Sequence, residues 1–288
     1  MTAETGAGSA NRLGDYLRAR RELVSPGAVG LPEDSRRRVP GLRREEVAML
    51  AGISSDYYHR LEQGRNRNPS AQVLEAIAGV LRLDESSTEH LLELGAARPR
   101  PRRTPRRRET VAPRIVELVH SLTMPAFVGG RYLDVLASNS LARALSPEFE
   151  TGENLLRAAF LGTEGRVRFD QREMVAMFRK RVGTDLDDPR VVRLVGELSL
   201  ASAAFQRAWA RHDVRPARGG PVHVDHPQVG PMELNLSKLV VDDIGDQWLV
   251  VYHPAAEHPE SADRLALLAS LVARVRPTSR EDVPSARE

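Results

Sequence analysis

The chain has 288 residues, of which 42 are basic and 39 acidic, so its formal net charge is +3. Hydrophobic residues make up 41% and charged residues 28%, which is typical of a folded globular protein and excludes a mostly disordered one. Cysteine is absent, which excludes disulfide scaffolds, cysteine nucleophiles, iron–sulfur clusters and zinc sites built on cysteine.

The N-terminal third has the pattern of short, capped helices. Apolar residues recur at intervals of three and four after a polar residue that can cap a helix, and glycines stand where helices would end. Residues 24–42 are rich in proline and glycine and predict an irregular segment. The expected caps are Asn11, Ser54, Ser70 and Asp84, and a short helix over 44–51 ends at Gly52. We therefore predict a five-helix domain over residues 11–95.

Residues 98–108 read RPRPRRTPRRR, with seven arginines and three prolines. Like charges repel, and proline lacks the backbone donor that helices and strands require. The segment therefore predicts an extended linker, which we place at residues 96–112. It is either a solvated tether or a basic strap that follows a phosphate backbone.

Beyond the linker, helical and strand-like patterns are mixed. Helices are predicted over 115–122, 154–160, 174–182, 191–209 and from a cap at Ser261 to 275. Strands are predicted over 126–128 and 132–137, joined as a hairpin, and over 222–224, 232–241 and 248–252. The mixture predicts an α/β domain over residues 113–276, followed by a flexible tail at 277–288.

Residues 44–63 read REEVAMLAGISSDYYHRLEQ, a spacing typical of a helix-turn-helix. Ala48 is small enough for two helices to touch, Gly52 takes the turn, and Tyr58 and Leu61 would hold the second helix on the first. An ordinary helical hairpin is the alternative. The neighbouring capped helices favour the helix-turn-helix, whose second helix enters the major groove of DNA.

The motifs V-A-M-L-A-G-I-S, L-E-Q-G-R and P-S-A-Q-V-L-E-A-I-A resemble the Cro/repressor-type domain of xenobiotic-response-element-like (XRE) bacterial regulators. The stretch GLRREEVAMLAGIS resembles an actinobacterial branch with a C-terminal sensor like that of methylenomycin-cluster regulators. Segments such as MPAFVGGRYLDVLASNSLARAL and QWLVVYHPA extend the resemblance over residues 111–275. It implies an N-terminal helix-turn-helix domain followed by a PAS-like α/β ligand-binding domain.

The resemblance also implies which residues meet DNA. Base contacts fall on Ser55, Asp56 and Arg60. Arg60 is suited to a bidentate contact with guanine, whereas Asp56 accepts from a cytosine amine or orients Arg60 four residues later. A buried ion pair is implied between Arg21 and Glu62. Phosphate contacts are expected at Arg43, Arg44, Ser54, Tyr57, Arg65 and Arg67, for which a solvated face is the alternative.

For the sensor, the resemblance implies an apolar pocket for a small, fatty-acid-like ligand. The candidate ligand contacts are Tyr132, Arg179, Trp209, Arg211 and His212, each of which could instead have a structural role. Metal binding is not expected at His223, Asp225 and His226, because successive strand residues point to opposite faces. The chain lacks the common motifs of catalysis and cofactor binding, so we expect no enzyme and no cofactor.

These observations predict a transcription regulator that binds double-stranded operator DNA as a homodimer and responds to a small molecule. Without a signal peptide or a run of about 18 apolar residues, it is expected in the cytoplasm and not in a membrane. The alternative is a protein-interaction module that dimerises through the PAS-like domain. An apolar stripe at Leu265, Leu268, Leu271, Val272 and Val275 is expected either to pair two chains or to pack within its own domain.

Overall fold

The computed structural model describes residues 11–32, 37, 39–66, 68–96, 109–162, 165–216, 219–241 and 246–275. They belong to two compact units, each of which combines two separate stretches of the chain. The first unit combines residues 1–107 with 170–216, and the second combines 108–169 with 217–288. The expected sensor, 113–276, thus contributes its middle part to the unit that holds the N-terminal helices. Residues 97–108 of the expected linker and the expected tail lie outside the described residues.

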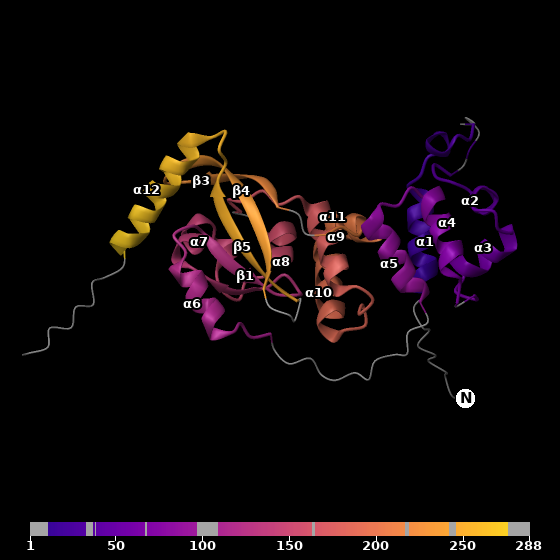
Figure 1. The fold of residues 1–288 in the computed structure, drawn as a ribbon, viewed down its shortest axis with the longest axis horizontal. Coiled ribbons are helices and arrows are strands. Elements are labelled where there is room, and N and C mark those ends of the chain that lie inside the picture. Colours follow the sequence, from indigo (N-terminus) through magenta and orange to yellow (C-terminus); the bar gives the residue numbers. More distant parts are fainter. Residues whose placement is uncertain are drawn as a thin grey trace, which may run out of the picture. The chain divides into compact units, whose positions relative to one another are not determined.

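The predicted N-terminal helices are present in the first unit (Figure 1). They are α1 (Arg12–Glu22), α2 (Arg44–Leu50), α3 (Ser55–Glu62), α4 (Ala71–Val80) and α5 (Glu85–Gly95), with a short 3-10 helix η1 (Gly27–Val29) in the irregular segment. The caps expected at Asn11, Ser54, Ser70 and Asp84 are confirmed. Each of these side chains accepts a hydrogen bond from the backbone N–H three residues later.

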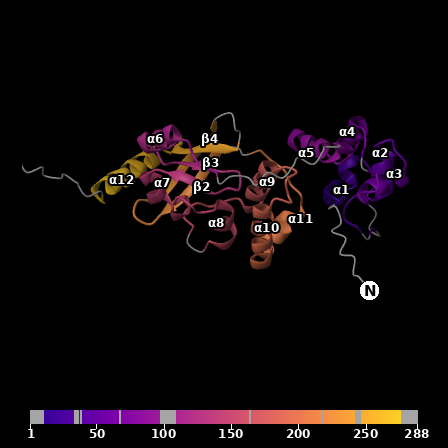
Figure 2. The same ribbon diagram turned by 90° about the horizontal axis from the view of Figure 1, so that it is seen from below.

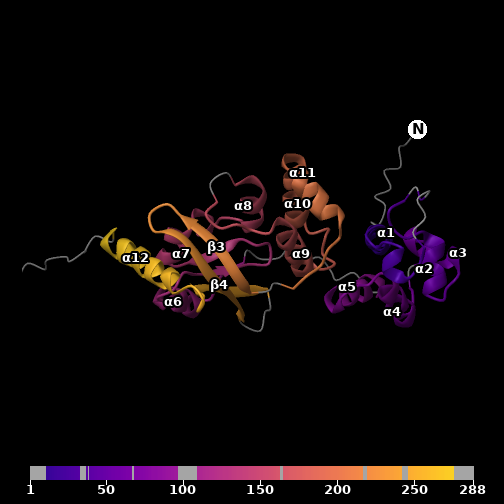
Figure 3. The same cartoon turned by 90° about the horizontal axis from the view of Figure 1, so that it is seen from above.

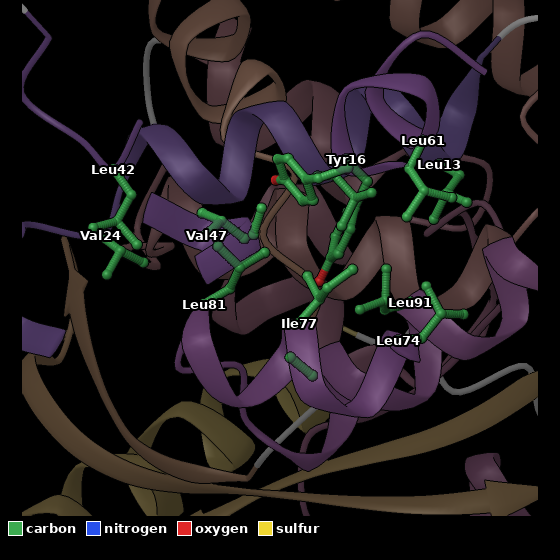
Figure 4. Close-up of a cluster of buried hydrophobic side chains, with 14 of the residues drawn as sticks. Leu13, Tyr16, Val24, Leu42, Val47, Leu61, Leu74, Ile77, Leu81 and Leu91 are labelled. Atoms are coloured by element: carbon green, nitrogen blue, oxygen red, sulfur yellow. The ribbon is translucent and has the colours of Figure 1, made fainter. Parts of the chain in front are cut away.

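The apolar faces of these helices meet in one core (Figure 4). Tyr16, Leu61 and Ile77 have no exposed surface, and each belongs to a different helix. Val214 joins the same core although it follows the last helix of the 170–216 segment. The hydrophobic contribution of this core is therefore shared between the N-terminal helices and a part of the chain more than a hundred residues away.

The segment 170–216 holds three helices, α9 (Gln171–Val182), α10 (Pro189–Ala201) and α11 (Ala203–Ala210). The single helix expected over 191–209 is wrong. The chain leaves helical geometry at Ser202, where φ is −140° and ψ is 111°, and the Ser202 hydroxyl accepts a hydrogen bond from Phe205 N at 3.2 Å. A serine side chain competes for backbone donors in this way, which ends one helix and caps the next.

Polar contacts hold the 170–216 segment against α1 and α5. Asp213 forms an ion pair with Arg20 of α1, and Lys180 of α9 lies 2.9 Å from a carboxylate oxygen of Glu89 on α5. Ser87 Oγ donates to the carbonyl of Val214 at 3.4 Å. Charged and neutral hydrogen bonds, as well as apolar packing, therefore join the N-terminal helices to the 170–216 segment.

The second unit is built on one antiparallel five-stranded sheet. Its strands are β1 (Ala126–Gly129), β2 (Val135–Ser138), β3 (Gly220–His226), β4 (Gly230–Val241) and β5 (Gln247–Pro254), in the order β2-β1-β5-β4-β3. Figure 3 shows β3 and β4 side by side as a long hairpin. The expected β1–β2 hairpin is also present. The predicted PAS-like α/β fold is confirmed.

Helices cover both faces of this sheet. They are α6 (Pro113–Ser121), α7 (Ser140–Leu145), α8 (Leu155–Leu161) and α12 (Pro259–Val275), with a short 3-10 helix η2 (Pro147–Phe149). Figure 2 shows α6 and α8 on opposite sides of the sheet. On the α6 side, Val119 packs on small and branched residues of β1 and β5. On the other side, the Phe127 and Phe149 rings stack 4.8 Å apart, and Tyr252 lies 5.2 Å from Phe149.

The cap expected at Ser261 is wrong, because α12 begins two residues earlier, at Pro259. Ser261 is buried and its hydroxyl accepts a hydrogen bond from Glu233 N of β4 at 3.0 Å. In the apolar stripe of this helix, Leu265 and Leu268 are buried within their own unit, whereas Leu271 and Val272 remain partly exposed. At least the first half of the stripe therefore packs internally.

Candidate DNA-binding surface and ligand pocket

The helix-turn-helix is formed by α2, a turn at Gly52 and α3. Gly52 has a φ of +68°, a left-handed conformation that glycine adopts without steric cost. Ala48 is buried against the turn, and its carbonyl accepts a hydrogen bond from Ile53 N at 2.9 Å. Tyr58 and Leu61 are fully buried, so they hold α3 by one face and leave its other face to solvent.

Ser55, Asp56 and Arg60 all lie on that exposed face. The guanidinium of Arg60 approaches the Asp56 carboxylate to 3.2 Å, and the two side chains are 49% and 73% exposed. An exposed i,i+4 pair contributes only about 0.3–0.5 kcal/mol to helix stability. The contact joins Arg60 Nη2 to Asp56 Oδ2, so it engages one end of a guanidinium fork that carries five N–H donors.

The residues expected to contact phosphates differ in their exposure and in their partners within the protein. Arg43 and Arg65 are exposed, and Tyr57 is partly buried. Ser54 uses its hydroxyl to accept from Tyr57 N, at 3.1 Å, as the cap of α3. Arg67 lies outside the described residues.

The Arg44 side chain is anchored by a buried carboxylate. Its Nε donates to Glu62 Oε2 at 2.5 Å, while Arg21 Nε donates to Glu62 Oε1 at 2.7 Å. Arg21 and Glu62 are buried, and the Arg44 side chain is 43% exposed. Burial alone would raise the pKa of Glu62, but hydrogen bonds from the two arginines outweigh it, and the pKa lies below its ordinary value.

The sequence analysis missed the pair between Arg37 and Glu46. Both ends of the Arg37 guanidinium donate to the Glu46 carboxylate at 2.7 Å, and Arg37 also donates to the carbonyl of Gly41. The pair ties the irregular segment to α2. An arginine that a simple charge count would assign to a DNA-facing patch is therefore occupied within the fold.

A pocket of about 390 Å³ lies in the first unit, between the N-terminal helices α1 and α5 and the segment that carries α9–α11. Arg179, Trp209 and His212 line it, and so does His90, which the sequence analysis had not singled out. Arg211 instead forms an ion pair with Asp213 at 2.8 Å. Tyr132 belongs to the second unit, where its carbonyl accepts from Asn154 Nδ2 at 2.8 Å. Apolar lining residues are Leu94, Leu186, Val191, Val192, Val195 and Gly196.

Comparison with known families agrees with this architecture. A family model described as the MmyB-like transcription regulator ligand binding domain matches residues 111–268, more than half of the chain. The chain belongs to the MmyB-like transcription regulators. A second family model, of a helix-turn-helix domain, matches residues 12–91, which contain α1–α4 and the first part of α5. A comparison with individual curated proteins finds no match.

This MmyB-like regulator is therefore a DNA-binding transcription regulator with a ligand-binding domain. The match to the ligand-binding family includes residues 170–216, which the structure groups with the helix-turn-helix. Within the described residues of the regulator, no helix has the length and apolar character to cross a bilayer.

The pocket of the MmyB-like regulator has an unusual charge distribution. Arg179 is 1% exposed; its Cζ lies 3.8 Å from the centre of the Trp209 ring, and its Nη2 donates to the Trp209 carbonyl at 2.7 Å. Burial lowers the pKa of Arg179 to about 10, so the guanidinium stays charged near neutral pH. Burial also lowers the pKa of His90 to about 4 and that of His212 to about 3, and the nearby Arg179 charge acts in the same direction.

The histidines of β3 in the regulator have protein partners. His223 Nδ1 lies 2.6 Å from Glu233 Oε1, and His226 Nε2 lies 2.9 Å from the carbonyl of Ala144. The part of the chain that the structure describes holds no group of three or more histidine and acidic residues placed to bind a metal ion.

Proposed function

We propose that this regulator recognises a specific operator through the exposed face of α3. The proposal rests on one observation, that one face of this helix is buried and the other is exposed to solvent. Tyr58, Leu61 and Glu62 hold it from inside, while the side chains at 55, 56 and 60 face solvent next to one another. A helix presented in this way by a helix-turn-helix places its N-terminal residues at base edges in the major groove.

In this proposal, Arg60 reads a guanine. Its guanidinium is paired with Asp56 on one side and keeps donors for the O6 and N7 acceptors of the base. A good bidentate contact of this type discriminates against other bases by about 1–3 kcal/mol. Arg43 and Arg65 are exposed and would contact phosphates, and Arg44 would be positioned for a phosphate by Glu62.

We further infer that two copies bind together, since one recognition helix reads too few base pairs to specify a site in a genome. Leu271 and Val272 stay partly exposed on α12 and support a pairing surface beyond Leu268. The operator would then be a pseudo-palindrome with half-sites about 34 Å apart, or a multiple of that distance. Sedimentation of a monomer together with a footprint over a single half-site would contradict this.

The ligand that we propose is small and mainly apolar. The support is the wall of the pocket in the first unit, most of which is apolar although five leucine and valine side chains stand beside six charged or histidine side chains. Pockets of about 300–1,000 Å³ with such a lining are typical of small-molecule sites. A ligand changes DNA affinity only to the extent that it binds the two states of the protein differently.

The test begins with selection of preferred sites from a pool of random duplexes by the full chain. Arg60→Ala should relax the preference at one base pair per half-site and cost about 1–3 kcal/mol on the selected operator. Arg65→Ala should weaken all sequences alike and reduce the salt slope by about one unit. Arg18→Ala is the matched control, since Arg18 is exposed on α1 outside the motif. An unchanged consensus with Arg60→Ala would disprove the assignment of α3 as the reading helix.

A further inference from the structure

Two edges of the sheet in the second unit are covered by other parts of the chain. At β2, Val135 N donates to the Glu153 carbonyl at 2.8 Å. At β3, Asp225 N donates to the carbonyl of Arg166 at 3.0 Å, and Pro221 has no backbone N–H to offer. Covering segments and prolines of this kind keep a sheet edge from pairing with another chain.

The end of β4 has no such cover in the described part of the chain. On one side, β5 pairs with β4 as far as Val241. On the other side, the pairing with β3 stops at Leu236, which lies opposite Gly220. Beyond Leu236, no described residue pairs with β4 on that side. We call residues 237–241 of β4 the open edge.

The backbone groups of Val240 point away from β5. In an antiparallel sheet, successive residues of a strand turn their N–H and C=O groups to opposite sides. The Glu233 carbonyl accepts from Ala255 N, just after β5, whereas the Leu236 carbonyl lies against Gly219, just before β3. Odd-numbered residues of β4 therefore face β5, and Val240, like Leu236, faces the opposite side. Val240 thus presents one donor and one acceptor at the open edge.

The side chains of the open edge are mostly apolar and exposed. Leu239 is 56% and Val240 is 74% exposed, on opposite faces of the sheet. Lys238, the charged residue of this stretch, has its Nζ 5.4 Å from the centre of the Trp248 ring, so its side chain lies over the sheet face. Exposed branched side chains beside available backbone groups favour the addition of a strand.

We propose that the open edge of β4 pairs with the open edge of a second copy of this chain, antiparallel and about a two-fold axis at Val240. In this register, Val240 N–H of each copy donates to the Val240 carbonyl of the other. The two Val240 side chains meet on one face of the sheet, and on the other face Leu239 lies opposite Val241 of the second copy. The two five-stranded sheets become one.

A second copy fits this edge because the edge is complementary to itself. A residue that carries both a donor and an acceptor can pair with its own image across a two-fold axis, which closes the assembly at two chains. The two Lys238 residues are displaced by four positions along the strands, or about 13 Å. That separation exceeds the Debye length of about 8–10 Å, so their repulsion is screened.

The contact is small, and this determines how the dimer behaves. Five residues per copy bury much less than the roughly 1,200 Å² of a standard interface, so the dimer should dissociate in the micromolar range or above. Two half-sites on one DNA would raise the effective concentration of the second copy and make the pairing productive. This inference rests on the proposed binding of two copies to an operator, and it adds the surface through which they meet.

Charge reversal at position 240 tests the register in the full chain. In sedimentation velocity, Val240→Glu alone and Val240→Lys alone should each raise the dimer dissociation constant about tenfold, because like charges then oppose each other. An equal mixture of the two variants should recover the dimer, because opposite charges then meet. Leu161→Glu and Leu161→Lys are the matched controls, since Leu161 is exposed on α8 outside the sheet, and they should dimerise like the parent.

Val240→Pro gives a second reading of the same contact. It removes the donor at the open edge without removing a hydrogen bond to β5, so the fold should persist, as its circular dichroism would show, while the dimer weakens. In the parent, amide-resolved hydrogen exchange at Val240 should slow as the protein concentration rises. The amide of Leu239, which faces β5, should be protected at every concentration.

Three results would overturn the pairing at β4. They are a chain that stays monomeric at millimolar concentration, Val240→Glu and Val240→Lys that dimerise like the parent, and a mixture of these two that fails to recover the dimer. The first result would leave the open edge to a strand of another protein. A dimer broken by Leu271→Glu but not by Val240→Glu would place the contact on α12 instead.

The operator separates this inference from the proposed function. On DNA with two half-sites, Val240→Glu should lose cooperativity, whereas its affinity for a single half-site should stay within about twofold of the parent. Equal cooperativity of Val240→Glu and the parent would overturn the β4 contact and leave DNA recognition standing. A dimer that follows the charge reversal in a protein that selects no DNA sequence would refute the proposed function and leave the β4 contact standing.

Discussion

Glu62→Gln tests whether one buried carboxylate on α3 holds α1 and α2 against that helix. Glu62 is fully buried at the end of α3 and accepts from Arg21 of α1 and Arg44 of α2. Glutamine keeps the shape but removes the charge. The change leaves Arg21, whose side chain is 7% exposed, as a buried cation that retains only weaker acceptors, such as the Leu42 carbonyl at 2.7 Å.

The expected loss is about 3–5 kcal/mol, since breaking a buried ion pair strands the remaining charge. Because the glutamine oxygen still accepts one hydrogen bond, the lower end of the range applies. With a urea m-value of about 2 kcal/mol per molar, the midpoint of unfolding of the first unit should fall by about 1.5 M. Such a change is large for a fold whose total stability is of the order of 5–15 kcal/mol.

The assay is urea unfolding of the full chain, followed by helical circular dichroism. Asp56→Asn is the control, because it removes an exposed pair on the same helix and should change stability by less than about 1 kcal/mol. The double variant Arg21→Met with Glu62→Leu should recover most of the loss, since it leaves no buried charge unpaired. If Glu62→Gln proved no more destabilising than Asp56→Asn, the buried pair would have little structural role and the reasoning would fail.

Three further predictions concern stability. His90 is buried in its neutral form with a pKa lowered to about 4. Its contribution to the free energy of unfolding is therefore complete above about pH 6.5 and is lost as the pH falls towards 4, by about 1.4 kcal/mol per pH unit. His90→Phe should make the urea midpoint depend less on pH between pH 7 and 5. Arg82 is exposed just after α4 with a φ of +51°, so Arg82→Gly should raise the melting temperature, whereas Arg82→Ala should not. Ser202→Ala removes the cap of α11 and should cost about 1 kcal/mol, and no change in urea midpoint would mean that the break between α10 and α11 is held by other contacts.

Sequence patterns were most informative where the decisive interaction is local. A cap such as Asn11 or Ser70 is a hydrogen bond between residues three apart, so its signal lies within one turn of the helix. The same holds for the Gly52 turn and for the β1–β2 hairpin. Ser202 carried an equally local signal, but apolar residues on both sides of it suggested one continuous helix.

Contacts between distant parts of the chain left no such trace. Arg20 and Asp213 are 193 residues apart in sequence, and no periodicity or composition relates them. The division of the chain into interleaved units depends on several contacts of this kind. The candidate site shows the same contrast. The resemblance carried by the helix-turn-helix motif indicated positions 55, 56 and 60, which are exposed, whereas the environment of His90 depends on Tyr16 and Arg179, which approach it only in the fold.

The interleaving of the two units has a consequence for protein engineering. Regulators of this architecture invite chimeras in which one DNA-binding domain is fused to another sensor at the arginine-rich segment 98–108. Here such an exchange would transplant α1 and α5 without the surface that covers them. The foreign sensor would have to supply equivalents of Val214, which lies in the core of those helices, and of Asp213, which pairs with Arg20. A functional exchange would require residues 170–216 to travel with residues 11–96, so the portable specificity module is discontinuous in the gene.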